Sequence, residues 1–198
     1  MEDHCFQTPV DEQRVRSVEV GDVIYITGSI VTARDQAHRR LLEYSDKGIE
    51  LPINLDGTVL YHCGPLVNKE KDKWVVVSAG PTTSTRMNFL TPKLLQRFGV
   101  RVIIGKGGMD HETVEALKRY GCIYCHFTGG AAVLAAKGIV DVERVEWLDL
   151  GIPEALWMLK VDSFGPLVVT IDSRGRSLYN EVKRAVQVDL DKLLKKIG

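Results

Sequence analysis

Short runs of β-branched and other apolar residues recur along this chain, and each leads into a loop rich in glycine or hydroxyl groups. The clearest runs are residues 23–31, 100–104 and 123–126, and a helical pattern follows each loop. Strands that alternate with helices in this way predict an α/β domain. In such a domain the loops at the carboxyl ends of the strands share one edge, so a binding site is expected there.

The same patterns predict the individual elements. Strands are expected at residues 23–31, 58–62, 74–78, 100–104, 123–126, 142–148, 167–171 and 177–179. Helices are expected at 37–44, from near 82–87, and at 111–120, 131–137 and 189–197. Asp110 and Gly121 are predicted caps, and Thr32 with Asp35 resembles a capping box that places Arg34 and Asp35 in a first helical turn. Residues 1–198 are expected to form a single domain, with 1–20 as a polar amino-terminal arm.

Charge and hydropathy argue against two classes of partner. Lys and Arg total 26, Asp and Glu also total 26, and the charges are interspersed, so no nucleic-acid surface is expected. No apolar run is long enough to span a membrane, and residues 1–16 lack the apolar core of a signal peptide. We therefore expect a cytoplasmic protein that binds neither nucleic acid nor membrane.

The run Cys122-Ile123-Tyr124-Cys125-His126 matches the attachment motif of c-type haem and contains the spacing of a redox dithiol. Haem attachment of this kind belongs to exported proteins, and redox dithiols lie at helix amino termini, whereas this run is a predicted strand. Two buried thiols are the preferred interpretation. Cys5 and Cys63 are isolated, so free thiols are favoured over disulfides, and no metal cluster is expected on this chain alone.

Three predicted loops each carry one basic side chain, namely Arg34, Arg86 and Lys106. Arginine offers a planar fork that matches a carboxylate, lysine offers a compact charge, and helix amino termini add unpaired N–H groups. Together these groups suit a small dicarboxylate. For each arginine alone, a surface ion pair is the alternative. A phosphate or nucleotide site around Lys106 is disfavoured because the Walker and dinucleotide spacings are absent.

Histidines are the remaining candidate acid–base groups, and those considered are His38, His62, His111 and His126. A single histidine more often packs, caps a helix or faces water than it acts in catalysis. His38 is the best placed, because it follows Arg34 by four residues and so lies on the same face of the predicted helix.

Several motifs together resemble the class I, iron–sulfur fumarate hydratases. They are Gly28-Ser29-Ile30-Val31-Thr32-Ala33-Arg34-Asp35-Gln36-Ala37-His38, Gly80-Pro81-Thr82-Thr83-Ser84-Thr85-Arg86-Met87, Gly105-Lys106-Gly107-Gly108-Met109, His126-Phe127-Thr128-Gly129-Gly130-Ala131-Ala132, Trp147-Leu148-Asp149-Leu150-Gly151-Ile152-Pro153-Glu154-Ala155 and Ile171-Asp172-Ser173-Arg174-Gly175. They keep the order of that family over roughly residues 21–179, and they cover only its carboxyl-terminal, or β-subunit, portion. The β subunit of L-tartrate dehydratase shares the same motifs.

The resemblance implies a swivelling β/β/α domain and a reversible addition of water to fumarate. A four-iron four-sulfur cluster is then expected in a partner α subunit, held there by three cysteines, so this chain would be inactive alone. By motif, Arg34, Arg86 and Lys106 are expected to bind substrate carboxylates, Thr83 to contact substrate and Thr82 to transfer a proton. Asp35 and His38 are expected to orient Arg34. Two alternatives stay open, an L-tartrate dehydratase β subunit and a non-catalytic module that binds small carboxylates.

Overall fold

The computed structural model describes residues 3–197, and in that range the main element is a mixed sheet of seven strands in the order β1-β2-β3-β6-β7-β9-β8. Its strands are β1 (Asp3–Gln7), β2 (Val23–Thr32), β3 (Val59–Tyr61), β6 (Val102–Gly105), β7 (Ile123–His126), β8 (Ile139–Glu146) and β9 (Leu156–Ile171). A separate ribbon pairs β4 (Leu66–Glu70) with β5 (Lys73–Ser78). The α-helices are α1 (Glu12–Arg16), α2 (Asp35–Asp46), α3 (Thr91–Arg97), α4 (His111–Tyr120), α5 (Ala132–Lys137) and α6 (Leu178–Ile197). The 3-10 turns are η1 (Ser84–Met87), η2 (Gly129–Ala131) and η3 (Leu148–Leu150).

The sheet closes on itself because β9 pairs along both of its edges. One edge runs antiparallel to β2, and the other runs antiparallel first to β8 and then to β7. Strands β2, β3, β6 and β7 are mutually parallel. Their carboxyl ends therefore lie along one rim, as the strand-and-loop pattern predicted.

Two hydrophobic cores lie on opposite faces of the closed sheet. The first is enclosed by the strands and contains the large side chains Tyr61, Trp157 and Phe164, all fully buried. The second, around Leu60 and Ile103, lies between the outer face and helices α2, α3 and α4. Successive strand residues point to opposite faces, which is why Leu60 and Tyr61 belong to different cores.

The prediction for α4 is confirmed at both ends. The side chain of Asp110 accepts a hydrogen bond from the backbone N–H of Thr113 at 2.9 Å, and Gly121 follows the last turn with φ of 64°. That left-handed conformation suits glycine, which has no Cβ to clash. Strand β7 also has its predicted bounds.

Two predicted features near the rim are wrong. Residues 177–179 do not form a strand, because α6 already begins at Leu178 and only Ser177 keeps a bridge to Ile171. The capping box at Thr32 does not form either, because the Thr32 hydroxyl accepts a hydrogen bond from the backbone N–H of Trp157 across β9. Helix α2 instead begins at Asp35, so Arg34 is its N-cap and lies in extended conformation.

The predicted strand at residues 74–78 is present as β5, but it lies outside the main sheet and pairs only with β4, which the sequence did not reveal. Residues 3–20, expected as a polar arm, form β1 and α1. Strand β1 runs parallel to β2, and Phe6, Val15 and Val18 are buried in the first core. The described part of this segment is therefore packed against the sheet.

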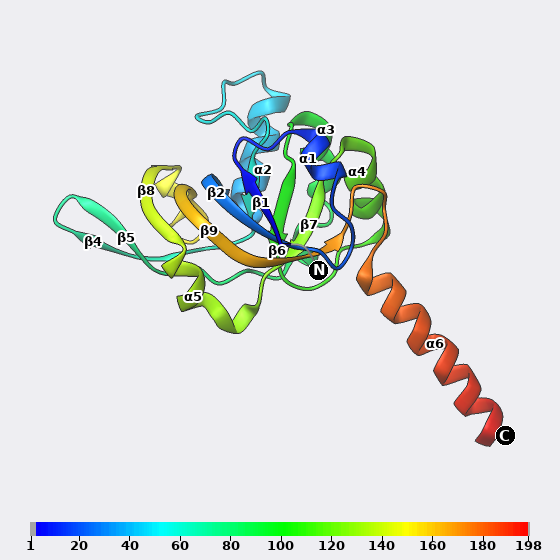
Figure 1. Cartoon of the computed structure of the whole chain (residues 1–198). Helices are drawn as coiled ribbons and strands as arrows, with labels where there is room; N and C mark the ends of the chain where they lie inside the picture. The colour runs from blue at the N-terminus through cyan, green and yellow to red at the C-terminus, as the bar shows by residue number, and fades with distance from the viewer. Residues whose placement is uncertain (1–2, 198) are drawn as a thin grey trace.

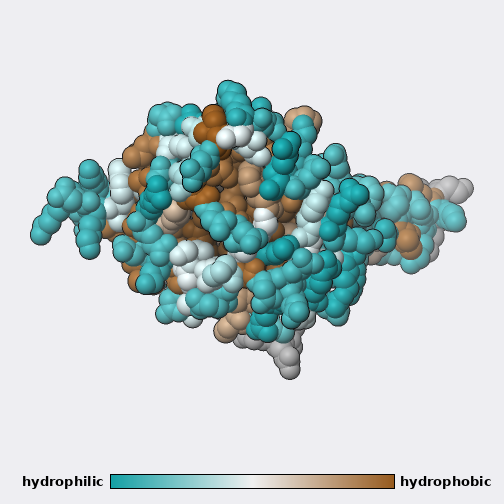
Figure 2. All heavy atoms as spheres, turned by 90° about the horizontal axis from the view of Figure 1, so that it is seen from above, coloured by the Kyte–Doolittle hydropathy of each residue, from teal (hydrophilic) through white to brown (hydrophobic). Residues whose placement is uncertain are grey.

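Two parts of the molecule extend away from the sheet (Figure 1). The β4–β5 ribbon projects on one side and α6 on the other. Helix α6 exposes Val182, Val186 and Leu193, and hydrophobic patches show on the projecting helix in the space-filling view (Figure 2). No helix in residues 3–197 combines the length and the apolar character needed to cross a membrane.

Candidate active site

The loops that follow β3, β5 and β6 are joined by backbone hydrogen bonds at the rim. Thr82 donates its N–H to the carbonyl of His62 at 2.7 Å, and Lys106 donates its N–H to the carbonyl of Thr82 at 3.3 Å. The N–H of Ser84 in turn reaches the carbonyl of Lys106 at 3.0 Å. These bonds place Thr82 and Thr83 directly beside Lys106, although more than twenty residues separate them in sequence.

Arg34 lies at the end of β2 and is held by a carboxylate. Its Nε atom lies 3.3 Å from Oε1 of Glu154, while Oε2 of Glu154 accepts the N–H of Gln36 at 2.9 Å. The Arg34 side chain also packs against Gly64, where a Cβ would come within 2.8 Å of its Nη1. Glu154 is therefore the carboxylate that lies beside Arg34.

Asp35 contacts a different arginine. Its Oδ2 atom lies 3.3 Å from Nη2 of Arg86, and the same Nη2 lies 3.5 Å from the hydroxyl of Thr82. A row Asp35–Arg86–Thr82 thus links the start of α2 to the loop before η1. A guanidinium beside a hydroxyl favours the charged alkoxide form of that hydroxyl, because opposite charge stabilises it.

The Lys106 side chain runs alongside Gly129, where a Cβ would lie 3.3 Å from its Cδ and 3.5 Å from its Nζ. No carboxylate oxygen lies within 4.0 Å of Nζ among the residues that the structure describes. Arg34 and Arg86 each have one carboxylate partner, with exposed fractions of 23% and 48% for the two side chains. The rim therefore offers three cationic side chains that remain accessible to a small anion.

His38 and His62 lie beneath the rim and are fully buried. The Nδ1 atom of His38 is 2.8 Å from the carbonyl of Arg34, and its ring meets that of His62 edge to face at 5.1 Å. Burial lowers the pKa of His38 to about 4 and lowers the pKa of His62 well below its usual value. Both rings are therefore neutral at pH 7, which makes them supports of the rim rather than proton donors to substrate.

Several residues at the rim carried no clear sequence signal. Glu154 lies far along the chain from Arg34, and Ser84 and Tyr124 approach His62 from η1 and β7. Tyr179 hydrogen-bonds Nδ1 of His126 at 2.8 Å and covers Gly108. Only the resemblance of motifs pointed to Glu154 and Ser84, since Glu154 lies within the motif of residues 147–155 and Ser84 lies within that of residues 80–87. His111 is exposed at the start of α4.

The cysteines do not form a metal or haem site in the described residues. Cys63, Cys122 and Cys125 are buried, and burial raises the pKa of each thiol, to about 12 for Cys63. Protonated, buried thiols are poor metal ligands, and no group of three or more His, Cys, Asp or Glu suited to a metal is present within 3–197. Within residues 3–197 the side chains are therefore not grouped in a way that fits a four-iron four-sulfur cluster.

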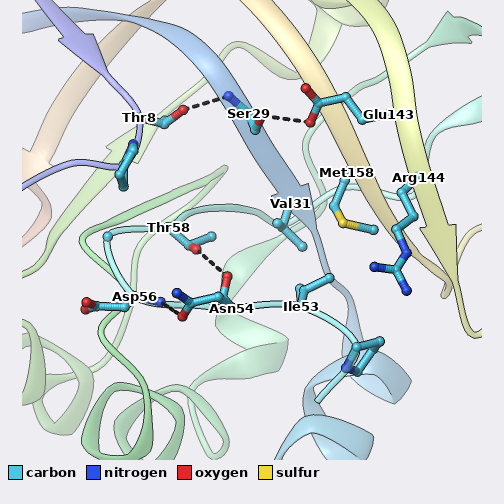
Figure 3. Close-up of a pocket in the computed structure, with 13 residues that line it drawn as sticks. Thr8, Ser29, Val31, Ile53, Asn54, Asp56, Thr58, Glu143, Arg144 and Met158 are labelled. Carbon is cyan, nitrogen blue, oxygen red and sulfur yellow. Dashed lines mark hydrogen bonds between the residues drawn. The ribbon is translucent and has the colours of Figure 1, made fainter. Parts of the chain in front are cut away.

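A cavity of about 440 Å³ lies near the other end of β3 (Figure 3). Ser29 and Glu143 are hydrogen-bonded there, and Asp56 and Thr58 come from the loop that precedes β3. The cavity contains none of the three cationic rim residues, and its one basic side chain, Arg144, is paired with Glu146. Its charge does not suit a dicarboxylate, so the candidate site is the open rim rather than this cavity.

Comparison with known proteins agrees with the motifs at the rim. The family model described as Fumarase C-terminus matches residues 5–182. The L(+)-tartrate dehydratase subunit beta of Escherichia coli K12 is 41% identical over 190 residues, which cover 96% of this chain and 93% of that protein. A putative L(+)-tartrate dehydratase subunit beta of Methanocaldococcus jannaschii is 42% identical over 91% of this chain and 93% of its own length. A putative class I fumarate hydratase of Geobacillus stearothermophilus is 42% identical over 90% of this chain but only 34% of its own length. The chain therefore belongs to the fumarase C-terminus family and is related to the hydro-lyase subunits of that family.

Proposed function

We propose that this chain is the β subunit of a class I fumarate hydratase, and that it catalyses the reversible hydration of fumarate to malate only together with an α subunit. The observation that supports this proposal is that Lys106 lies beside the Thr82 loop, Arg86 beside the Thr82 hydroxyl, and Asp35, the neighbour of Arg34, beside Arg86. Three cations match a substrate with two carboxylates and leave one cation beside a hydroxyl.

Each residue then has a distinct task. Arg34 and Lys106 bind carboxylate oxygens of the substrate, and Thr83 adds a hydroxyl contact. In the dehydration direction the Thr82 Oγ1 takes a proton from the carbon next to the hydroxyl-bearing one, and it returns that proton in hydration. A threonine hydroxyl is a weak base, so Arg86 at 3.5 Å is needed to stabilise its alkoxide. Asp35 keeps Arg86 in place, and His38 supports Arg34 through its backbone carbonyl.

The α subunit supplies what this chain lacks. We assign the four-iron four-sulfur cluster to that subunit, where it would act as a Lewis acid on the substrate hydroxyl. Two comparisons support a second component. The Escherichia coli relative is named as one subunit of an enzyme, and about two thirds of the Geobacillus stearothermophilus relative lies outside the match. The carboxyl-terminal domain would meet the α subunit as a swivelling unit in a cytoplasmic complex.

L-Tartrate is the alternative substrate, and the names of the Escherichia coli and Methanocaldococcus jannaschii relatives favour it. Tartrate is also a four-carbon dicarboxylate, so the same cations suit it, and its additional hydroxyl is open to recognition by the α subunit. Loss of water from tartrate gives oxaloacetate after tautomerisation, with no change in the roles of Thr82 and Arg86.

The proposal is tested by producing this chain with the product of its neighbouring gene under anaerobic conditions. Fumarate hydration and L-tartrate dehydration are then assayed for each chain alone and for the mixture. Activity on fumarate in the mixture only supports the proposal, while activity on tartrate only selects the alternative. If the mixture is inactive on both but this chain binds succinate, the chain is a non-catalytic carboxylate-binding module.

A further inference from the structure

A series of buried hydrogen bonds runs behind the rim and connects the loop after β3, η1 and β7. Nδ1 of His62, the residue after β3, lies 2.8 Å from the Ser84 hydroxyl in η1, which lies 3.0 Å from the Tyr124 hydroxyl on β7. The Tyr124 hydroxyl also lies 2.8 Å from the carbonyl of Gly107, the residue after Lys106. His62 and Ser84 are fully buried, and so is the Tyr124 side chain.

The carbonyl of Gly107 determines which group donates in each of these hydrogen bonds. A carbonyl only accepts, so the single hydrogen of the Tyr124 hydroxyl is directed to Gly107. The hydroxyl of Ser84 must then donate to the Tyr124 oxygen, and Nδ1 of His62 must donate to Ser84. His62 is therefore the Nδ1–H tautomer. His38 is the same tautomer, because its Nδ1 faces the carbonyl of Arg34.

Gly105 leaves the space in which these hydrogen bonds form. A Cβ at Gly105 would lie 1.9 Å from the Ser84 hydroxyl, 3.1 Å from the Tyr124 hydroxyl and 3.3 Å from Nδ1 of His62. Only a residue without a side chain at position 105 lets the three polar groups meet. The Nε2 atoms of His38 and His62 have no hydrogen-bond partner among the described residues, so each ring is held through Nδ1 alone.

The geometry points to a positioning role for His62, Ser84 and Tyr124: their directional relay sets the spacing between the Thr82–Arg86 loop and the Lys106 loop. Ser84 belongs to the first loop, and Gly107 belongs to the second. The relay therefore holds the proton-transferring hydroxyl at a defined distance from a carboxylate-binding amine. Its kinetic consequence rests on the proposed function, whereas the hydrogen bonds themselves do not.

The first test needs no activity. Imidazole ¹H–¹⁵N NMR spectra of the full chain distinguish the two histidine tautomers, because protonated and bare ring nitrogens have well-separated ¹⁵N shifts. We expect the Nδ1–H form at His62 and His38, and a Ser84→Ala variant should alter the Nδ1 signal of His62 only. An Nε2–H form at His62 would overturn the relay, since Nδ1 would then accept the Ser84 hydrogen and only two hydroxyl hydrogens would remain for the three contacts.

The second test compares Tyr124→Phe with Tyr61→Phe. Tyr61 also donates a buried phenol hydrogen to a backbone carbonyl, that of Ala79, but from the opposite face of the sheet. In the full chain, amide hydrogen exchange at Ser84 and Lys106 should accelerate at least tenfold in Tyr124→Phe and less in Tyr61→Phe. Equal amide exchange rates in the two variants would contradict the relay and would show that Tyr124 acts only through packing.

The assembled enzyme supplies the third readout. If wild-type α and β chains turn over fumarate or tartrate, kcat/KM should fall about tenfold or more in Tyr124→Phe, because small displacements of catalytic groups are costly. A similar loss in Tyr61→Phe would contradict a specific role of the relay. An inactive wild-type mixture would refute the proposed function, while the NMR and exchange results would still decide the relay.

Discussion

The carboxylate of Asp35 lies 3.3 Å from the guanidinium of Arg86, although three strands, β3, β4 and β5, separate the two residues along the chain. Because Arg86 also lies 3.5 Å from the Thr82 hydroxyl, the first residue of α2 contacts an arginine that lies beside Thr82. The last residue of the same helix, Asp46, pairs with Arg97 at 2.8 Å on the surface. The helix thus provides one ion pair at the candidate site and a second, exposed pair as a matched control.

Substituting Asp35→Asn should lower kcat by about tenfold to a hundredfold in the assembled enzyme, because Arg86 loses the charge that holds it beside Thr82. Asp46→Asn should leave kcat unchanged, since an exposed ion pair contributes little. Steady-state kinetics of both variants provide the comparison. If Asp35→Asn and wild type had equal kcat, the claim that Asp35 holds Arg86 in place for catalysis would be wrong.

Lys106→Ala should raise the KM for a dicarboxylate by about tenfold to a hundredfold, the range expected when a charged hydrogen bond is removed. Lys47→Ala is the control, because Lys47 pairs with Glu43 at the other end of α2. Succinate binding by calorimetry tests the same assignment without turnover. Unchanged affinity in Lys106→Ala would mean that the rim does not bind the carboxylates.

Glu154→Gln should weaken substrate binding by about tenfold, because the neutral amide still accepts the N–H of Gln36 but no longer attracts Arg34. Glu146→Gln removes a comparable charge from a surface pair with Arg144 and should have no such effect. Inhibition by succinate gives the measurement. An effect of equal size in both variants would point to net charge rather than to Arg34.

Stability should fall as the pH is lowered from about 6.5 toward 4, the interval between the ordinary pKa of histidine and that of buried His38. In this window the unfolded chain binds protons that the folded chain excludes, so folding loses of order 3 kcal/mol from His38 alone. His62 acts in the same direction. Carboxylates with lowered pKa, such as Glu12, contribute mainly below this window. Thermal unfolding measured across this pH range provides the test. The unfolding temperature of His38→Gln should change less with pH than that of wild type, whereas the exposed His111→Gln should show the same pH dependence as wild type.

Thiol reagents should modify Cys5 alone in the folded chain, because Cys63, Cys122 and Cys125 are buried and their thiols stay protonated. All four should react after unfolding in guanidinium. Rapid native labelling of Cys122 or Cys125 would revive the redox-dithiol interpretation. A Soret band in the purified chain would revive the haem interpretation.

Local signals predicted local structure well. Helix α4 has its cap residues in its own sequence, Asp110 and Gly121, and the contacts of these residues with Asn88 and Arg101 involve their backbone groups, so the Asp110 carboxylate is left to cap the helix. Thr32 carries a similar signal, but its hydroxyl bonds to Trp157, more than a hundred residues away. The sequence of strand β5 resembles that of any other β-branched strand. Its pairing with β4 instead of the main sheet could not be predicted, because alternation of residues along a strand does not identify the strand with which it pairs.

The sequence by itself determined the α/β class and the family through its ordered motifs, and it singled out three cations in loops that follow strands. The tertiary structure decided which carboxylate holds which arginine: Glu154 lies with Arg34, and Asp35 lies with Arg86. It also decided that His62, Ser84 and Tyr124 meet, across the space left by Gly105. The physical reason is range. Capping and strand periodicity act over a few residues, whereas ion pairs and buried hydrogen bonds depend on strand order and register, which are settled only when the sheet closes.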